Sequence, residues 1–282
     1  MIRSTRATVL TLLLTLLFAA SAAATVAGCG SSGTTGSTTT AAEDAQPPDA
    51  EAEHGHFSYS GAEGPAHWGS LNPDWAKCSD GKRQSAINLS APARANYPAI
   101  TYSYQPEPFE VVNNGHAIEV QADQSRSSVE LSGKTYVLDQ FHLHAPSEHK
   151  LNGHLMPMEI HIVHQTPDKQ LAVVAVFVVP GKANPAFDQI VSKLPAKEGE
   201  TTKLEAMLDP QQLIPSGSAI AYRYTGSLTT PPCTEGVTWT VYQKPITASP
   251  AQIDAIKAIY DNNARPVQAR NGRSLRQAAA TN

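Results

Sequence analysis

The alternation of apolar and polar residues along the chain predicts a domain built mainly from β-strands. Short runs rich in Val, Ile, Leu, Tyr and Phe recur along the chain, and turn-forming residues separate them. The run Leu171–Val179 is apolar without interruption, as expected of a strand buried on both faces. Asn114-Gly115 between two runs is typical of a β-hairpin turn. The predicted strands are Ala99–Tyr104, Glu110–Val112, Ala117–Gln121, Ser128–Leu131, Gln140–His144, Glu159–His164, Leu171–Val179, Ala219–Gly226 and Thr238–Gln243.

One helix is predicted near the end of the chain. Ser249 precedes Pro250, and a capping residue followed by proline at the first helical position marks a helix start. Ile253, Ile256 and Ile259 then recur at helical spacing and give the segment an apolar face. No internal repeat is visible in the sequence. The pattern on its own therefore predicts a β-rich domain with a few helices.

The amino-terminal region carries a different pattern. Arg3 and Arg6 precede an apolar stretch over residues 7–27, which is the arrangement of a secretory signal peptide. The stretch ends in Val-Ala-Gly-Cys29, a motif similar to a bacterial lipobox. We therefore expect a signal peptide over residues 1–28 and lipidation of Cys29. An ordinary signal peptide cut nearby, or an uncleaved anchor, is the alternative.

A spacer is predicted over residues 29–55. Ser, Thr, Gly and Ala dominate its first half, and acidic residues and Pro47-Pro48 follow. Such a segment has little apolar bulk to bury, so we expect it to be disordered and to hold the domain off a membrane. The expected location is outside the cytoplasm, periplasmic or at the cell surface, with the protein anchored as a lipoprotein.

Length and charge limit the possible classes of protein. The 282 residues are 41% hydrophobic and 16% charged, which suits one globular domain with appendages. We expect this domain over residues 56–273 and a polar tail over residues 274–282. The chain has 21 basic and 25 acidic residues, a net charge of −4, and no basic run beyond the amino terminus. The composition therefore gives no indication of a nucleic-acid partner.

Three histidines carry the strongest chemical signal. His142 and His144 are two residues apart in one predicted strand, so their side chains point to the same face. His161 lies in the next predicted strand. Three neutral imidazoles can hold a zinc ion and leave its fourth position open for water. The cysteines are distant in the sequence, which favours a catalytic metal site over a closed structural one.

Neighbouring polar residues raise the weight of this signal, because a lone His-x-His on a strand is more often a surface pair. Gln140 and Glu159 each precede a histidine by two residues and share its strand face. Metal-bound histidines usually donate their second ring N–H to such an amide or carboxylate. Glu148 lies in the sequence between the two predicted strands that carry the histidines.

Four motifs surround these histidines along the chain. They are Gln140-Phe-His-Leu-His144, Pro146-Ser-Glu-His149, Met158-Glu-Ile-His-Ile-Val-His164 and Gly226-Ser-Leu-Thr-Thr-Pro-Pro-Cys-Thr-Glu-Gly236. Together they resemble the α-class carbonic anhydrases, in particular the bacterial secreted branch. The resemblance runs from His56 to about Arg273 and implies a mostly β, α+β fold. It implies a large, twisted, mainly antiparallel central sheet with a few peripheral helices, and zinc in a conical cleft.

The resemblance also implies an activity, the reversible hydration of CO2 to bicarbonate and a proton by zinc-bound hydroxide. His142, His144 and His161 would be the zinc ligands. Thr229 and Glu148 would orient the hydroxide through a chain of hydrogen bonds. The remaining implied residues are the proton shuttle His116, the water-ordering residues Tyr59 and Asn114, and the substrate-pocket residues Val163, Val173, Leu228, Thr230, Val237 and Trp239.

The three cysteines fit the same picture. An odd number of cysteines in an exported protein calls for an explanation. If Cys29 carries lipid, Cys78 and Cys233 remain, and the matching positions of secreted bacterial relatives form a disulfide. An exported protein is in a compartment that permits this bond.

The sequence departs from the family pattern at three positions. Ala86 follows Gln84-Ser85 where relatives have proline, so the expected cis-proline is absent and a trans bond is predicted. Phe57 occupies a position where tryptophan is common. Glu119 lies near the shuttle and could alter the water network. His149 resembles a residue that forms hydrogen bonds inside the fold.

Two other classes of protein remain as alternatives. His142-x-His144 followed by Glu148 partly fits the cupin metal motif, although the second half of that motif is absent around Pro157–His161. A non-enzymatic binding protein on the same fold is the other alternative, but such relatives typically lose a zinc histidine. Many bacterial relatives dimerise, so the resemblance also implies a homodimer.

Overall fold

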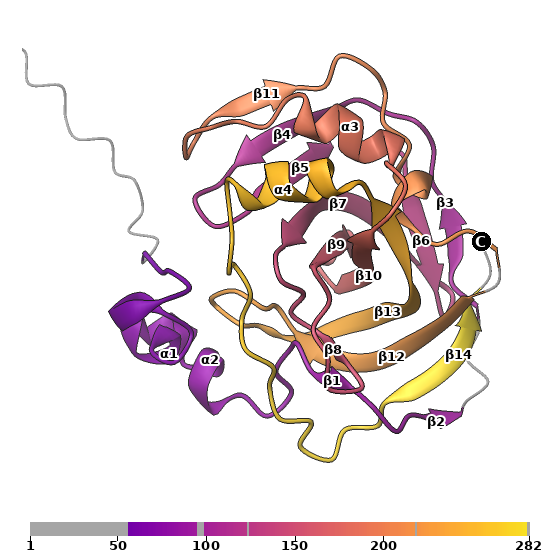
Figure 1. Cartoon of the computed structure of the whole chain (residues 1–282). Coiled ribbons are helices and arrows are strands. Elements are labelled where there is room, and N and C mark those ends of the chain that lie inside the picture. Colours follow the sequence, from indigo (N-terminus) through magenta and orange to yellow (C-terminus); the bar gives the residue numbers. More distant parts are fainter. Residues whose placement is uncertain (1–55, 95–98, 123, 218, 281–282) are drawn as a thin grey trace, which may run out of the picture. The chain divides into compact units, whose positions relative to one another are not determined.

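The structure is a computed structural model that describes residues 56–94, 99–122, 124–217 and 219–280 (Figure 1). The predicted signal peptide, the lipidated Cys29 and the spacer lie outside the described residues and remain predictions. In the described part of the chain, no helix is both long and apolar enough to span a bilayer.

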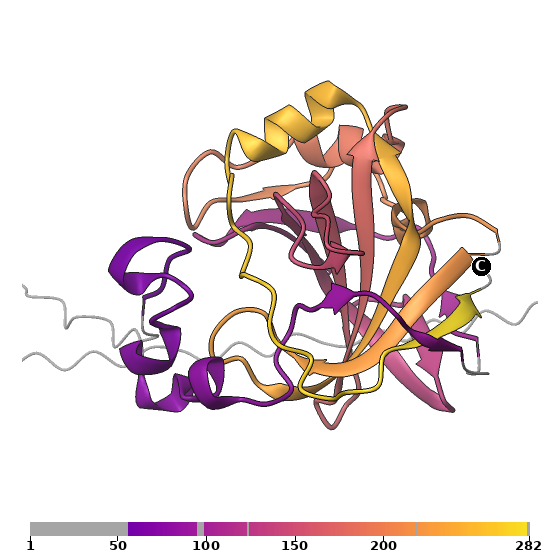
Figure 2. The ribbon, with the colours of Figure 1, turned by 60° about the horizontal axis from the view of Figure 1, so that its bottom comes forward.

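A large mixed sheet forms the centre of the domain (Figures 1 and 2). A separate short parallel pair joins β1 (Asn88–Leu89) to β8 (Lys150–Leu151). The strands of the large sheet are β2 (Ala93–Arg94), β3 (Thr101–Ser103), β4 (Phe109–Asn113), β5 (Ile118–Ala122), β6 (Ser128–Leu131), β7 (Lys134–His144), β9 (Met158–Gln165), β10 (Leu171–Pro180), β11 (Thr201–Lys203), β12 (Ala219–Ser227), β13 (Glu235–Ala248) and β14 (Arg276–Ala280).

The order of the strands confirms the predicted fold class. The main path runs β11-β4-β5-β7-β9-β10-β13-β12-β14-β2, and β6 pairs with both β3 and β7. The pairs β10–β13 and β14–β2 are parallel. The other pairs of this sheet among the described residues are antiparallel. The domain is thus mostly β, with a large twisted sheet that is mainly antiparallel.

All nine predicted strands are present, several with longer bounds than the sequence indicated. β7 begins at Lys134 and β13 continues to Ala248, well beyond the predicted runs. The Asn114-Gly115 turn joins β4 to β5, and Gly115 adopts a positive φ of 85°. The strands that the pattern did not predict are β1, β2, β8, β11 and β14. The first four have two or three residues, which is too short to show a period of two.

The predicted polar tail over residues 274–282 needs correction. Arg276–Ala280 forms β14, which lies between β12 and β2 in the sheet. Leu275, just before this strand, is fully buried. The sheet therefore continues beyond Arg273, because backbone pairing with β12 does not require an apolar pattern in the partner strand.

The helices are short and lie at the margins of the sheet. The predicted helix is α4, whose start at Ser249 is a capping box: its side chain accepts from the Gln252 N–H, and the Gln252 side chain accepts from the Ser249 N–H. It ends at Lys257, before Ile259. The helices are η1 (Gly61–Glu63), α1 (Trp68–Leu71), η2 (Pro73–Trp75), α2 (Lys77–Asp80), α3 (Pro185–Val191), η3 (Pro210–Leu213) and α4 (Pro250–Lys257).

Two hydrophobic clusters occupy the two faces of the central strands. Alternating residues of β9 and β10 divide between them, because successive side chains of a strand point to opposite faces. The Phe141 cluster contains Phe141, Ile160, Ile162 and Val174, and the apolar faces of α3 and α4 pack on it. The Trp239 cluster contains Trp239, Val163, Val173 and Phe177. His161 alternates with Ile160 and Ile162, so it lies on the Trp239 side.

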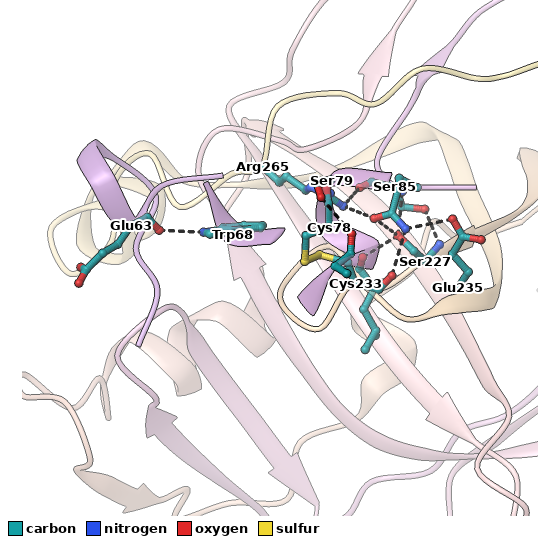
Figure 3. The surroundings of a disulfide bond; sticks show 12 residues. Glu63, Trp68, Cys78, Ser79, Ser85, Ser227, Cys233, Glu235 and Arg265 are labelled. Atoms are coloured by element: carbon teal, nitrogen blue, oxygen red, sulfur yellow. Dashed lines mark hydrogen bonds between the residues drawn. A yellow bond between two sulfur atoms is a disulfide. The ribbon is translucent and has the colours of Figure 1, made fainter. Parts of the chain in front are cut away.

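A disulfide ties the amino-terminal helices to the loop between β12 and β13 (Figure 3). It joins Cys78 to Cys233, which confirms the predicted pairing. Arg265 strengthens the same junction (Figure 3). This arginine is buried, donates to the carbonyls of Cys78 and Ser85, and lies 5.7 Å from the Trp68 ring centre. The amino-terminal segment is therefore held by one covalent and several polar contacts.

The prediction of a trans bond before Ala86 is wrong, because the Ser85–Ala86 peptide is cis. Hydrogen bonds fix the backbone on both sides of it. The Ser85 N–H donates to Ser227 Oγ at 2.9 Å, and the Ser85 carbonyl accepts from Arg265. The Ala86 carbonyl accepts from the Gln268 N–H at 2.7 Å. These partners lie far away in the sequence, so the short motif could not reveal them.

We predict that Cys78→Ala/Cys233→Ala lowers the free energy of unfolding by about 3 to 5 kcal/mol, since a link between residues 155 positions apart strongly restricts the unfolded chain. Urea denaturation with and without a reductant measures the change. Reductant should destabilise the wild type and leave the double variant unaffected. An equal midpoint for both proteins under oxidising conditions would contradict the prediction.

Candidate metal centre

Three histidine side chains converge between β7 and β9. His142 lies directly opposite His161 in the antiparallel pair, and His144 follows on the same face of β7. The ring centres are 5.0 Å apart for His142 and His144, 5.3 Å for His142 and His161, and 4.6 Å for His144 and His161. Their possible ligand atoms all lie within 4.8 Å of one another. His144 and His161 are buried and His142 is half-buried, so the cluster is more open at His142.

One nitrogen of each ring already faces a polar partner. His142 Nδ1 lies 2.8 Å from Gln140 Oε1, and His144 Nδ1 lies 2.7 Å from the carbonyl oxygen of Asn263. His161 Nε2 lies 3.2 Å from Glu159 Oε1, a close approach without the geometry of a hydrogen bond. The nitrogens left over are Nε2 of His142, Nε2 of His144 and Nδ1 of His161.

These remaining nitrogens fit a metal ion. His144 Nε2 is buried and has no hydrogen-bond partner among the described residues. A buried polar atom without a partner is rare in folded proteins, so it calls for an additional ligand. Three imidazole nitrogens with outer partners are the donor set of an open zinc site.

Burial favours the neutral form of His142 and of His161. It lowers the pKa of His142 well below the usual value, and the nearby His144 and His161 lower it further. Burial also lowers the pKa of His161, although the Glu159 charge opposes the shift. A neutral ring offers the lone pair that a metal needs, whereas a protonated ring does not.

Glu159 holds the segment next to the cluster. Its Oε2 accepts from the backbone N–H groups of Glu148 and His149, both at 2.9 Å, and its Oε1 lies 2.7 Å from His149 Nδ1. Burial alone would raise the pKa of Glu159, but the neighbouring rings of His149 and His161 and their hydrogen bonds bring it well below the usual value. Glu159 is therefore a buried carboxylate with several donors around it.

His149 is held inside the fold, as the sequence indicated. It is fully buried, and its Nε2 lies 2.7 Å from the Tyr224 hydroxyl. That hydroxyl donates to Ser85 Oγ at 2.9 Å. His149 thus links Glu159 to the amino-terminal segment.

Glu148 reaches the cluster from the segment between β7 and β9. Its Oε1 accepts from the Arg265 backbone N–H at 2.8 Å. Its Oε2 is buried without a hydrogen-bond partner among the described residues, at 3.6 Å from His144 Nε2 and 3.8 Å from His161 Nδ1. This oxygen is available to a donor beside the histidines.

Thr229 and Thr230 lie in the loop after β12. The Thr229 side chain is buried, and the Thr230 carbonyl accepts from the Cys233 N–H at 2.9 Å. The disulfide at Cys233 anchors this loop. The described contacts include no hydrogen bond from Thr229 to Glu148 Oε2, so the predicted pairing of these two residues stays a prediction.

The predicted pocket residues gather on the His161 side of the sheet. Val163, Val173, Val237 and Trp239 belong to the Trp239 cluster, and Leu228 packs against it. The rings of His161 and Trp239 have centres 4.8 Å apart. The structure thus brings an apolar surface next to the histidines, while the conical shape of the cleft stays a prediction.

His116 follows the turn between β4 and β5. Its ring stacks on Phe57, with centres 3.7 Å apart and planes at 14°. Burial lowers the pKa of His116, the neighbouring charge of His56 lowers it further, and Glu198 opposes both. Phe57, at the position where relatives often have tryptophan, is therefore part of the environment of His116.

The other predicted water-ordering residues have distinct surroundings. The Tyr59 hydroxyl is buried without a partner among the described residues, and burial raises its pKa well above the usual value. Asn114 is exposed and donates to Glu119 Oε2 at 3.1 Å. Burial raises the pKa of Glu119, although hydrogen bonds from Gln121 and Asn114 oppose the shift.

Asn263 belongs to the metal centre but was not predicted from the sequence. Its carbonyl oxygen faces His144 Nδ1, and its side-chain amide donates to the carbonyls of Leu143 and His116 at 3.0 and 3.1 Å. It also accepts from the Ala145 N–H. The residue lies in an irregular segment more than a hundred positions after β7, so no local pattern could identify it.

Comparison with known proteins agrees with this geometry. A family model of eukaryotic-type carbonic anhydrases matches residues 63–279. The chain belongs to the α-class carbonic anhydrase family. The cupin alternative is therefore wrong, because the match extends over most of the chain and includes all three histidines.

Several relatives of this carbonic anhydrase have similar length. The chain is 39% identical to the carbonic anhydrase of Neisseria gonorrhoeae, over 79% of this chain and 88% of that protein. It is 37% identical to the carbonic anhydrase of Pectobacterium atrosepticum, over 78% of this chain and 90% of that protein. The α-carbonic anhydrase of Thermovibrio ammonificans, solved with the inhibitor sulfanilamide, has a TM-score of 0.76 and 40% identity, covering 79% of this chain and 99% of that one.

We predict that the pKa of His116, measured by NMR titration, lies below the usual 6.5. Phe57→Ala and His56→Ala should each raise it, because the first removes the covering ring and the second removes a like charge. Since the folded pKa is lowered, the stability associated with neutral His116 is present above pH 6.5 and is lost as pH falls through the folded pKa. His154→Ala, at an exposed position, is the control and should leave the titration unchanged.

Proposed function

We propose that this carbonic anhydrase catalyses the zinc-dependent, reversible hydration of CO2 to bicarbonate and a proton. The observation that carries the proposal is the convergence of His142, His144 and His161, each with one ring nitrogen turned toward a common centre. When bound, zinc supplies a Lewis acid that makes water nucleophilic at neutral pH. The presence of all three histidines argues against a purely non-enzymatic binding protein.

The histidines would hold zinc through the nitrogens that their outer partners leave free. Gln140 would fix the ring of His142, Asn263 that of His144, and Glu159 that of His161. Neutral ligands leave the full double charge on the metal, which favours acidification of water more than carboxylate ligands would.

Thr229 and Glu148 would aim the nucleophile. We propose that the Thr229 hydroxyl donates to Glu148 Oε2, the buried oxygen that lacks a donor. The Thr229 oxygen is then restricted to accepting a hydrogen bond from the reacting water, which directs a lone pair of that water at the substrate. The Arg265 backbone N–H holds the other oxygen of Glu148 in place.

The Trp239 cluster would hold the substrate. CO2 is small and apolar, and Val163, Val173, Leu228, Val237 and Trp239 form an apolar surface beside His161. Thr230, which is half-buried, would lie at the solvent side of this pocket. An apolar wall favours CO2 and releases the charged product bicarbonate.

His116 would carry the proton to solvent. It is half-buried and not among the clustered histidines, so it can exchange protons without leaving the metal under-ligated. Tyr59 and Asn114 would order the intervening water molecules. Glu119 is bound to Asn114 and could share this task.

We also propose that the protein is exported and anchored through a lipid on Cys29. The proposal rests on the sequence of residues 1–29, which has the pattern of a signal peptide ending in a lipobox-like motif. Two or more acyl chains anchor a protein stably to a membrane, whereas a single acyl chain gives only marginal membrane binding. A homodimer remains a proposal that gel filtration can test.

We predict that His144→Ala loses most of its zinc, and that CO2 hydration falls by more than about 100-fold, because removing even an outer partner of a ligand costs about 10- to 100-fold. Metal analysis and stopped-flow CO2 hydration, with and without a zinc chelator, provide the measurement. His142→Ala serves as a second variant because its side chain is less buried. His154→Ala is the control. Full activity of a zinc-free His144 variant would refute the site.

We predict that His116→Ala reduces kcat in weak buffer by up to about 100-fold and that added imidazole restores it. The value of kcat/KM for hydration should barely change, because attack on CO2 precedes proton export. His67→Ala, at an exposed position, is the control. A parallel fall of kcat and kcat/KM without rescue by imidazole would assign His116 a structural role.

We predict that Cys29→Ser moves the protein from the membrane fraction to the soluble fraction, or stops its processing, while the isolated domain stays active. Cell fractionation and mass spectrometry of the mature wild-type protein provide the measurement. An unmodified Cys29 at the mature amino terminus would exclude the lipid anchor.

A further inference from the structure

A second cavity lies beside β12 and β14, apart from the histidine cluster. Its volume is about 410 Å³, which is within the range of small-molecule sites, about 300 to 1,000 Å³. Its walls include the turn between β6 and β7, the edges of β12 and β13, and the segment that leads into β14. None of the histidines of the metal centre lines it.

Four arginines line this cavity, and they come from distant parts of the chain. They are Arg83, Arg223, Arg273 and Arg276. Arg223 and Arg276 lie directly opposite each other in the antiparallel pair of β12 and β14, a position at which like charges are unfavourable. No aspartate or glutamate is among the residues that line the cavity. Since the whole chain has a net charge of −4, composition alone does not explain this concentration of positive charge.

Arg273 is fixed in place by neutral partners. Its guanidinium donates to the carbonyls of Gln84 and Thr225 at 2.8 and 3.2 Å and lies 5.7 Å from the centre of the Tyr224 ring. Burial lowers the pKa of Arg273, the charges of Arg270 and Arg83 lower it further, and Tyr224 and Glu235 oppose the shift. The orientation of Arg273 is therefore set without a carboxylate contact among the described hydrogen bonds and ion pairs.

Arg83 offers a donor that the fold does not use. Its side chain is exposed, and within the described ranges it makes no hydrogen bond or ion pair. Its backbone N–H, by contrast, donates to Glu235 Oε1 at 2.6 Å. The side chain can therefore turn to a ligand in the cavity without giving up a contact within the protein.

The chemistry of the walls defines the ligand. Guanidinium groups bind carboxylates and phosphates through paired hydrogen bonds. Ser132, Thr225 and Thr238 also line the cavity, and their hydroxyl groups can add donors. Four guanidinium groups around one space favour an anion with several charged oxygens over one with a single charge.

We propose that this cavity binds a small oxyanion carrying two or more negative charges, an organic phosphate or a polycarboxylate. The site is distinct from the metal centre, and its ligand class differs from bicarbonate, which carries one charge. Arg273 forms the fixed base of the site, Arg83 closes on the ligand from the loop, and Arg276, whose Nε donates to Ser274 Oγ, borders the site from β14.

NMR titration of the zinc-loaded, isotope-labelled protein at low ionic strength tests the proposal. The probes are inorganic phosphate and succinate, with formate at matched ionic strength as the monovalent comparison. We expect saturable shifts of the Thr225 and Thr238 amides with at least one divalent probe, and much weaker ones with formate. Arg83→Gln/Arg276→Gln should weaken binding by at least about tenfold, the effect of losing one hydrogen bond to a charged group.

A matched double variant separates the cavity from general charge effects. Arg126→Gln/Lys182→Gln removes the same two charges at exposed positions that do not line the cavity, and it should bind the probe like the wild type. Arg83→Gln alone, which removes no contact of the described fold, decides the question if the first double variant does not fold. Absence of saturable shifts with both divalent probes, equal binding by the two double variants, or equally tight binding of formate would overturn the proposal.

Discussion

The buried carboxylate of Glu159 is the constraint on which the metal centre depends. A carboxylate away from water is costly unless donors surround it. Here two backbone N–H groups and the His149 ring meet it, and the His161 ring lies within 3.2 Å. Satisfying this one charge therefore fixes the segment that carries Glu148, the ring of His149 and the ring of His161. Three parts of the site take their positions from a single group.

The same group connects the site to the amino-terminal segment. From Glu159, hydrogen bonds pass through His149 and Tyr224 to Ser85, which also accepts from the Ser227 N–H. Ser227 precedes the loop of Thr229, and the Cys78–Cys233 disulfide anchors the far end of that loop. The amino-terminal segment, although it supplies none of the clustered histidines, thus helps to hold the loop whose Thr229 we propose as the orienting residue. This explains why polar residues are buried so densely around Ser85.

Much of this arrangement could be predicted from the sequence, but not the contacts between distant segments. Alternating residues indicated β7 and β9, and the uninterrupted apolar run Leu171–Val179 indicated β10. The spacing of His142 and His144 placed them on one face. The sequence of β14, Arg-Gln-Ala-Ala-Ala, has no alternation of apolar and polar residues, so this segment was predicted as a polar tail. Asn263, the cis peptide at Ser85 and the arginine-lined cavity depend on residues that meet only in the folded chain. A sequence motif contains residues that are close in the chain, whereas these features depend on residues that are close only in the folded structure.

Metal ligands are best buried, whereas a group that exports protons has to reach solvent. The fold places the two kinds of group in different regions. Burial lowers the pKa values of His142 and His161, which keeps their nitrogens available to a metal. A group that exchanges protons with solvent has to be less buried than His144 and His161, and His116 on the turn between β4 and β5 is half-buried. Asn263 joins the two regions, because its backbone carbonyl faces His144 while its side-chain amide holds the His116 carbonyl. One asparagine thereby fixes the position of a proposed proton carrier relative to a proposed metal ligand, although the two act in different environments.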